Sequence, residues 1–306
     1  MRAPANHPLL VRALPRGSDG LVCAIDPASA GWTWTTFHVY RLEPGQQIAR
    51  AADDQERLVL LLEGYASVRA GTHSFERVGS RMSVFDGPPA EVVLVEPGLD
   101  VSVVALSACL VGVAAAPGGR VQRTAHIRAS EILVEDRGSG NTARRIHHLL
   151  PPGGDVAGRL IAFEAFTPGG NWCSYPPHKH DTENPPVEAA LEELYYYRFA
   201  RPAGFAFTRV YTPDRTLDET MTPMDGDLVL VPRGYHPVGA PAGYDCWFLN
   251  IMAGPNREWH FTIDPDHEWL MNWSPADPAR LSGGAAGRLV ALRRAATRRR
   301  PTRPAP

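Results

Sequence analysis

Lysine is almost missing from this chain of 306 residues: Lys179 is the only one, and every other permanently basic side chain is an arginine. The formal net charge is −2, so the chain has no excess of basic side chains for binding nucleic acid phosphates. Its apolar runs are all shorter than a membrane span, and its N-terminus has no apolar core of a secretory signal. We therefore expect a cytoplasmic protein that binds neither nucleic acid nor membranes.

Cysteines are also few, and none of them forms the Cys-x-x-Cys spacing of redox or metal motifs. The four are Cys23, Cys109, Cys173 and Cys246. We interpret them as free thiols in a reducing compartment, which agrees with the cytoplasmic expectation.

Short apolar segments separated by Gly and Pro dominate the first half of the chain. The clearest predicted strands are residues 34–42, 57–62, 65–70, 91–95 and 101–106. Short strands at fairly regular spacing are typical of a β-barrel or β-sandwich, so we expect an all-β protein. The segment 121–133 should add a strand or two that crosses between the two halves of the chain.

Two histidines, His178 and His180, stand two residues apart in a segment that we expect to be extended. Because strand side chains alternate between faces, both imidazoles would lie on one face. Glu193 on a later strand and His236 after another can complete a set of three nitrogens and one oxygen. This pattern predicts a site for one divalent metal with open positions, suited to polarising an oxygenated substrate. Nitrogen-rich sites accept several first-row ions, so zinc, manganese, iron and nickel all remain candidates.

Longer runs around these residues resemble known proteins. The block 226–236, which ends at His236, is similar to the second signature of the cupin superfamily. The segment 163–269 resembles the 5-deoxy-glucuronate isomerase family of inositol catabolism, which is related to the 4-deoxy-5-keto-uronate isomerases of pectin breakdown. The matching runs are 178–181, 192–197, 204–212, 225–238 and 249–254. The resemblance implies a metal-dependent aldose–ketose isomerase (an intramolecular oxidoreductase) that converts 5-deoxy-glucuronate to 5-dehydro-2-deoxy-gluconate in myo-inositol degradation.

The same resemblance implies a bicupin, with two tandem jelly-roll-like β-barrels. We expect a cupin-like barrel at 1–125 that binds no metal, because the corresponding region lacks a His-x-His pair. The metal-binding barrel should occupy 126–275. Residues 276–306 are rich in Arg, Pro and Ala, and we expect them to form a disordered tail.

The segment between His180 and Glu193 is longer than in most cupins, which leaves Glu192 and Glu193 as alternative ligands. Related isomerases place the metal-binding Glu directly before a hydrophobic-Tyr strand, which favours Glu193. Isomerisation also implies groups that move protons between adjacent carbons. The candidate catalytic residues are Glu192, Tyr195, Tyr197 and Tyr235. Strand alternation places both Tyr195 and Tyr197 on the Glu193 face, and Glu192 on the other face. A metal-assisted hydride shift, which needs no base, is the alternative.

The implied substrate is a small sugar acid, so its carboxylate must be bound, and arginine can do this with two hydrogen bonds. Arg209, in the predicted strand 207–211, is our first choice, followed by Arg233 and Arg257. Lys179 is a further candidate for substrate binding, although strand alternation points it away from the ligand face. Assembly into a homo-oligomer is compatible with the sequence.

Two other functions compete with isomerisation. A cupin dioxygenase would hold iron in the same ligand set and consume oxygen, which an isomerase does not need. A non-enzymatic sugar-binding or storage cupin is the third alternative. Storage cupins commonly lack the metal ligands, so the intact ligand set counts against it.

Overall fold

Strands make up nearly all of the regular structure in this computed structural model, which describes residues 7–118, 123–154 and 156–273. The predominance of strands confirms the expectation of a β protein. The helical segments are short: α1 (Pro27–Ala30), η1 (Ala129–Glu131), η2 (Gly140–Thr142) and η3 (Pro265–Asn272). None of the helices in the described part of the chain is long and apolar enough to cross a membrane.

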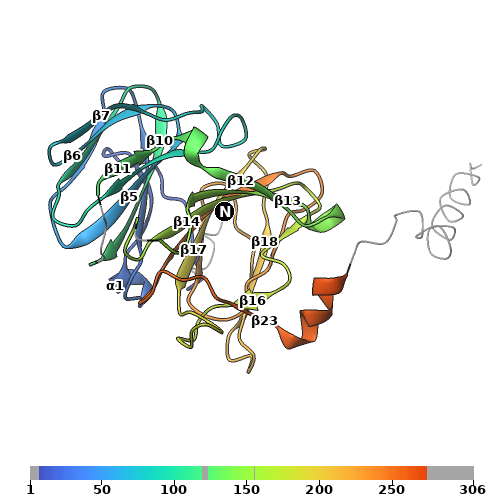
Figure 1. The fold of residues 1–306 in the computed structure, drawn as a ribbon. Helices are drawn as coiled ribbons and strands as arrows, with labels where there is room; N and C mark the ends of the chain where they lie inside the picture. Colours follow the sequence, from blue (N-terminus) through green and yellow to red (C-terminus); the bar gives the residue numbers. More distant parts are fainter. Residues whose placement is uncertain (1–6, 119–122, 155, 274–306) are drawn as a thin grey trace, which may run out of the picture. The chain divides into compact units, whose positions relative to one another are not determined.

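The N-terminal half contains two sheets that face each other across a core of their own. The six-stranded sheet has the order β11-β8-β5-β10-β3-β2, and the four-stranded sheet has the order β4-β9-β6-β7. The strands are β2 (Leu21–Ile25), β3 (Thr36–Leu42), β4 (Gln47–Arg50), β5 (Gln55–Glu63), β6 (Ala66–Ala70), β7 (His73–Val78), β8 (Glu91–Val95), β9 (Val101–Ala105), β10 (Cys109–Pro117) and β11 (Ala125–Ile127). Figure 1 draws these strands in blue to green.

The C-terminal half is built on a seven-stranded sheet with the order β1-β20-β17-β22-β14-β13-β12. Its strands are β1 (Leu10–Val11), β12 (Leu133–Arg137), β13 (Arg144–Leu150), β14 (Ile161–Thr167), β17 (Glu192–Phe199), β20 (Leu228–Val231) and β22 (Cys246–Ala253). A four-stranded sheet has the order β15-β21-β18-β19, and β16 pairs with β23. These strands are β15 (Trp172–Cys173), β16 (His178–Lys179), β18 (Phe207–Tyr211), β19 (Asp218–Met221), β21 (Val238–Gly239) and β23 (Thr262–Ile263).

Strand β5 shows how the two halves share one core. Its side chains alternate between faces, and both faces are buried. Val59 and Leu61 pack between the two N-terminal sheets. Leu58 and Leu60 belong instead to the larger core, which also contains residues of β17 and β22. Burial on both faces explains why this strand is a continuous apolar run in the sequence.

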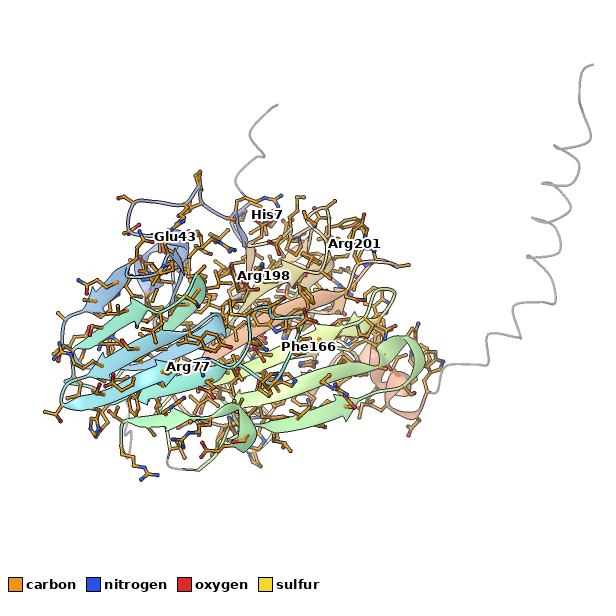
Figure 2. The ribbon with its side chains drawn as sticks, turned by 90° about the horizontal axis from the view of Figure 1, so that it is seen from above. His7, Glu43, Arg77, Phe166, Arg198 and Arg201 are labelled. Atoms are coloured by element: carbon orange, nitrogen blue, oxygen red, sulfur yellow. The ribbon has the colours of Figure 1, made fainter. Side chains whose placement is uncertain are left out.

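Polar contacts also join the two halves. Arg198 of β17 lies where they meet (Figure 2), and its guanidinium is 3.2 Å from the carboxylate of Glu63 in β5. The aromatic rings of Phe37 and Tyr196 pack edge to face across the same boundary, with centroids 6.1 Å apart. The described residues up to Met271 accordingly form one compact unit, and the following unit, Asn272–Pro306, is described only at its first two residues.

Most of the predicted strands are present. Residues 57–62, 91–95 and 101–106 correspond to β5, β8 and β9. The described part of the predicted segment 121–133 does lead from one half to the other, because β11 belongs to the six-stranded sheet and β12 to the seven-stranded sheet. The division of the chain at residue 125 stays a prediction, and the predicted tail, 276–306, lies outside the described residues.

Candidate metal centre

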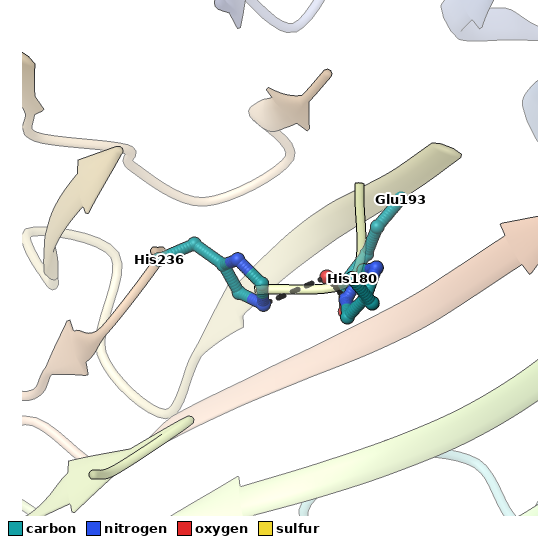
Figure 3. A group of neighbouring side chains, drawn as sticks. All are labelled: His180, Glu193 and His236. Carbon is teal, nitrogen blue, oxygen red and sulfur yellow. Dashed lines mark hydrogen bonds and ion pairs between the residues drawn. The ribbon is translucent and has the colours of Figure 1, made fainter. Parts of the chain in front are cut away.

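Three of the four predicted metal ligands converge in the C-terminal half (Figure 3). His180 follows β16, Glu193 lies in β17, and His236 lies between β20 and β21. One ligand atom from each residue lies within 4.8 Å of the others, and all three residues are buried. The fourth predicted ligand, His178 of β16, lies beside them: its ring centroid is 5.0 Å from that of His236.

The sheet holds Glu193 firmly in place. Strand β17 is hydrogen-bonded on both sides, and Glu193 pairs with Val231 of β20 and Met252 of β22. The carboxylate is fixed as well, because the side-chain amide of Asn250 in β22 donates a hydrogen bond to its Oε1 atom. Its Oε2 atom then faces the histidines, at 2.9 Å from His180 Nε2 and 3.0 Å from His236 Nε2.

Each histidine uses its Nδ1 atom to bond a backbone carbonyl. The partners are Pro176 O for His178 (3.0 Å), Leu191 O for His180 (3.3 Å) and Gly234 O for His236 (2.8 Å). A carbonyl oxygen can only accept, so Nδ1 must carry the hydrogen in all three rings. In the neutral rings each Nε2 atom is therefore a lone-pair donor, as a metal ligand must be.

A cation between the Nε2 lone pairs and the carboxylate oxygen would satisfy all of them at once. Among the described residues, His236 Nε2 is a buried nitrogen without a hydrogen-bond partner. Burial raises the pKa of Glu193, but the neighbouring His236 and His180 outweigh this effect and hold the pKa well below its ordinary value. Burial, assisted by His236, lowers the pKa of His178 to about 3, so this ring is neutral. The donor set thus fits a divalent metal ion.

A pocket opens beside this group of ligands. His178, Glu193, Ser174 and Asn250 line it, together with Tyr195, whose hydroxyl is 2.9 Å from Ser174 Oγ. Burial, followed by the charge of Glu193, raises the pKa of Tyr195 well above its ordinary value. The phenol therefore keeps its proton at neutral pH and can donate a hydrogen bond to a molecule bound in the pocket.

The other candidate catalytic residues lie elsewhere. Both oxygens of the Glu192 carboxylate accept hydrogen bonds from the backbone amides of Thr33, Trp34 and Thr35, at 2.6 to 2.9 Å. This carboxylate holds the N-terminal half, and we correct its assignment as a catalytic group. Of the remaining tyrosines, Tyr197 bonds Thr208 at 2.7 Å in the core, and the ring of Tyr235 packs on Tyr211.

The predicted substrate-binding residues are also occupied elsewhere, and none of the four lines the pocket in the described part of the chain. Arg209 makes a two-point ion pair with Asp218 at 2.7 Å, on an exposed surface. Arg257 is buried and donates to backbone carbonyls, including Leu160 O at 2.8 Å. Lys179 points away, as alternation predicted, and pairs with Asp181 and Glu188. Arg233 is exposed. The contacts of Lys179, Arg209 and Arg257 therefore give no support to a role in substrate binding, and that role stays a prediction for Arg233.

Sequence reasoning missed several residues that do line the pocket. They are Arg137, Arg144, Ser174, Asn250 and Trp259. Asn250 could have been noticed from the sequence, because it is the one amide side chain in strand β22, which is otherwise apolar and has no charged residue. The two arginines carry no such local signal, because their position depends on how β12 pairs with β13.

Comparisons with known proteins find similar sequences over most of the chain. The model of the KduI/IolB family matches residues 9–270. A 5-deoxy-glucuronate isomerase from Geobacillus thermodenitrificans is 48% identical over 254 residues, which cover 83% of this chain and 92% of the relative. One from Listeria monocytogenes is 41% identical, with 82% and 92% covered.

Solved structures resemble the chain as well. An IolB-like protein from Salmonella typhimurium superposes with a TM-score of 0.83 at 41% identity, covering 87% of this chain and all of the other. The oxalate decarboxylase of Lactobacillus farciminis superposes with a TM-score of 0.60 at 12% identity, covering 95% and 97%. The second likeness concerns the fold alone, which is cupin-like.

Proposed function

This chain belongs to the KduI/IolB family, and we propose that it converts 5-deoxy-glucuronate to 5-dehydro-2-deoxy-gluconate, a cytoplasmic step of myo-inositol degradation. It is an enzyme, an aldose–ketose isomerase like its relatives. The observation that carries the proposal is the buried group His180, Glu193 and His236 beside a pocket, in a chain that is 48% identical to a 5-deoxy-glucuronate isomerase.

We propose that the reaction depends on one divalent metal. His180, Glu193 and His236 would hold it, with His178 as the fourth ligand, and the Nδ1–carbonyl bonds that orient the rings support this assignment. A divalent ion held there would polarise the substrate carbonyl and stabilise the negative charge that develops on its oxygen. The ligand types accommodate zinc, manganese, iron or nickel.

Two residues of the pocket prepare the site for proton transfer. Asn250 fixes the Glu193 carboxylate, so that Oε2 faces the histidines. Tyr195 keeps its hydroxyl proton, and when Ser174 is the donor in the hydrogen bond between the two hydroxyls, the Tyr195 hydroxyl can donate to an oxygen of the sugar. We propose Tyr195 as the proton donor, and we no longer propose Tyr197 or Tyr235, whose rings lie outside the pocket lining.

We also propose that the two halves are tandem cupin barrels. In each half a large sheet accompanies a four-stranded sheet, and the likeness to oxalate decarboxylase extends over 95% of the chain. We propose one metal per chain, held by the group of ligands that the C-terminal half provides.

The proposal is tested by incubating the purified protein with 5-deoxy-glucuronate, with and without oxygen. We expect the ketose product in equal yield under both conditions, followed by nuclear magnetic resonance, and no oxygen uptake at an electrode. Oxygen consumption coupled to loss of the substrate would instead indicate the cupin dioxygenase.

A further inference from the structure

Two arginines face the pocket from neighbouring strands. Arg137 at the end of β12 and Arg144 at the start of β13 are direct cross-strand partners, and both line the pocket that holds His178 and Glu193. Directly opposite residues of an antiparallel pair have their side chains on the same face. Two like charges in such a position repel each other, which normally destabilises the sheet.

The next pair along the same two strands has the opposite character. Asp136 and Arg145 are also cross-strand partners, but their side chains point to the other face. They form an exposed two-point ion pair, with nitrogen–oxygen distances of 2.7 and 3.0 Å. The face away from the pocket is therefore matched in charge, whereas the face towards the pocket carries two positive charges.

The guanidinium of Arg144 has no carboxylate to balance it. It donates to the backbone carbonyls of Thr142 (2.9 Å) and Tyr175 (3.4 Å), and within the described residues it forms no ion pair. The charge of Arg137 is partly compensated, because its Nε atom donates to Glu135 at 2.8 Å. Arg144 is thus the cation in the pocket that an incoming anion can pair with.

A further donor faces the same space. The indole Nε1 atom of Trp259 is buried without a hydrogen-bond partner in the described structure, and Trp259 lines the pocket. The guanidinium carbon of Arg137 lies 5.7 Å from the centre of its ring. An unpaired donor beside two positive charges favours an anionic acceptor.

We propose that Arg144, assisted by Arg137 and the indole of Trp259, binds the carboxylate of the substrate. This rests on the proposed function, in which the substrate is a sugar acid with a carbonyl at one end and a carboxylate at the other. The carboxylate end pairs with Arg144 while the carbonyl end faces Glu193 and the histidines. Arg144 is then the residue that selects an acid over a neutral sugar, the role that the sequence suggested for Arg209.

The arginines remain accessible on a second side. They also line a neighbouring cavity of about 510 Å³, to which Phe85, His147 and Phe166 contribute. This larger cavity lacks His178 and Glu193 among its lining residues, so we assign the reaction to the smaller pocket and not to it.

Two adjacent substitutions test the proposal. Arg144→Gln removes the charge that faces the pocket, and Arg145→Gln removes the charge next to it on the exposed face. For Arg144→Gln we expect the KM for 5-deoxy-glucuronate to rise about 10- to 100-fold with little change in kcat, because a carboxylate that keeps its charge is bound uniformly. Arg145→Gln should match the wild type. Metal content and melting temperature are measured for both, and Arg144→Lys, which keeps a charge without the planar fork, should recover part of the loss.

Binding without turnover separates this proposal from the proposed function. Titration of the wild type with D-glucuronate and its neutral analogue D-glucuronamide, followed by tryptophan fluorescence, should show tighter binding of the acid. Arg144→Gln should abolish that preference, and Arg145→Gln should keep it. A preference for the acid without any isomerase activity would refute the function but keep the anion site. No preference in the wild type, or an unchanged preference in Arg144→Gln, would overturn the role of Arg144.

Discussion

At the scale of single residues, orientation matters as much as identity. His180 and His236 direct their Nε2 atoms towards Glu193 because backbone carbonyls accept the hydrogens of their Nδ1 atoms, and a third carbonyl orients the neighbouring ring of His178 in the same way. Asn250 does the same for Glu193, since an amide donor on Oε1 leaves Oε2 to face the rings. Such outer contacts typically change metal affinity or activity by about 10- to 100-fold when they are removed.

The first residue-scale prediction concerns Asn250. In Asn250→Leu the carboxylate of Glu193 loses its amide donor and can rotate, so we expect metal affinity to fall about 10- to 100-fold. Competition with a chelator of known affinity measures this change, and the melting temperature of the metal-free variant shows whether the fold is intact. Unchanged metal affinity in a folded variant would mean that Asn250 does not position Glu193.

At the scale of elements, strand β17 does two jobs with two neighbouring carboxylates. Glu193 points into the site, whereas Glu192 points to the other face and binds three backbone amides of residues 33–35. Alternation along a strand requires this division. The same strand thus joins the metal centre to the packing of the two halves.

The prediction for this element is a loss of stability without a loss of metal. Glu192→Ala leaves three amides without their charged acceptor, so we expect the free energy of unfolding to fall by about 2–3 kcal/mol. Denaturant unfolding measures the change, and Glu258→Ala, at an exposed carboxylate, is the matched control. Loss of the bound metal in Glu192→Ala, with stability intact, would instead make Glu192 the ligand.

The face of the strand on which each side chain of the site lies could be predicted from the sequence, because side chains alternate along a strand. This alternation brings His178 and His180 to one side, separates Glu193 from Glu192, and turns Lys179 away. The hydrogen bonds show that Glu192 and Lys179 both point away from the ligands. Glu192 accepts from backbone amides of the N-terminal half, and Lys179 donates to Asp181 and Glu188. Each of these statements depends on residues that are close in sequence.

The arginines could not be predicted in this way. Whether an arginine is free to bind a substrate depends on whether a carboxylate faces it from another strand. Arg209 is neutralised by Asp218 through the pairing of β18 with β19, and Arg257 is held by carbonyls about a hundred residues away. Arg144 is exposed to the pocket only because β12 and β13 pair in a register that puts Arg137 opposite it.

At the scale of the whole molecule, a buried ion pair ties the two halves together. Arg81 of the N-terminal half binds Glu164 of β14, and His147 of β13 bonds the same carboxylate at 2.8 Å. Arg81 is 3% exposed and Glu164 is fully buried. Removing one partner of such a pair leaves an uncompensated buried charge, which typically costs about 3–5 kcal/mol.

The pH dependence of stability follows from the same group. Burial raises the pKa of Glu164, but Arg81 and His147 outweigh it and hold the pKa below its ordinary value. A carboxylate with a lowered pKa in the folded state contributes stability above its unfolded pKa, and this contribution is lost as the pH falls through the folded value. We therefore expect the melting temperature of Glu164→Gln to fall less than that of the wild type as the pH is lowered. The melting temperature is measured from neutral pH to pH values below the ordinary glutamate pKa. An acid transition identical to that of the wild type would show that other carboxylates control it.

The central claim is that a metal held by His180, Glu193 and His236 supports isomerisation, and metal content measured together with turnover tests it most directly. Purified wild-type protein should contain one divalent ion per chain and isomerise 5-deoxy-glucuronate. His236→Ala should retain the fold but lose both properties, while the control His73→Ala, at an exposed site, should keep both. Undiminished isomerisation by His236→Ala, or no isomerisation by fully metal-loaded wild-type protein, would contradict the account.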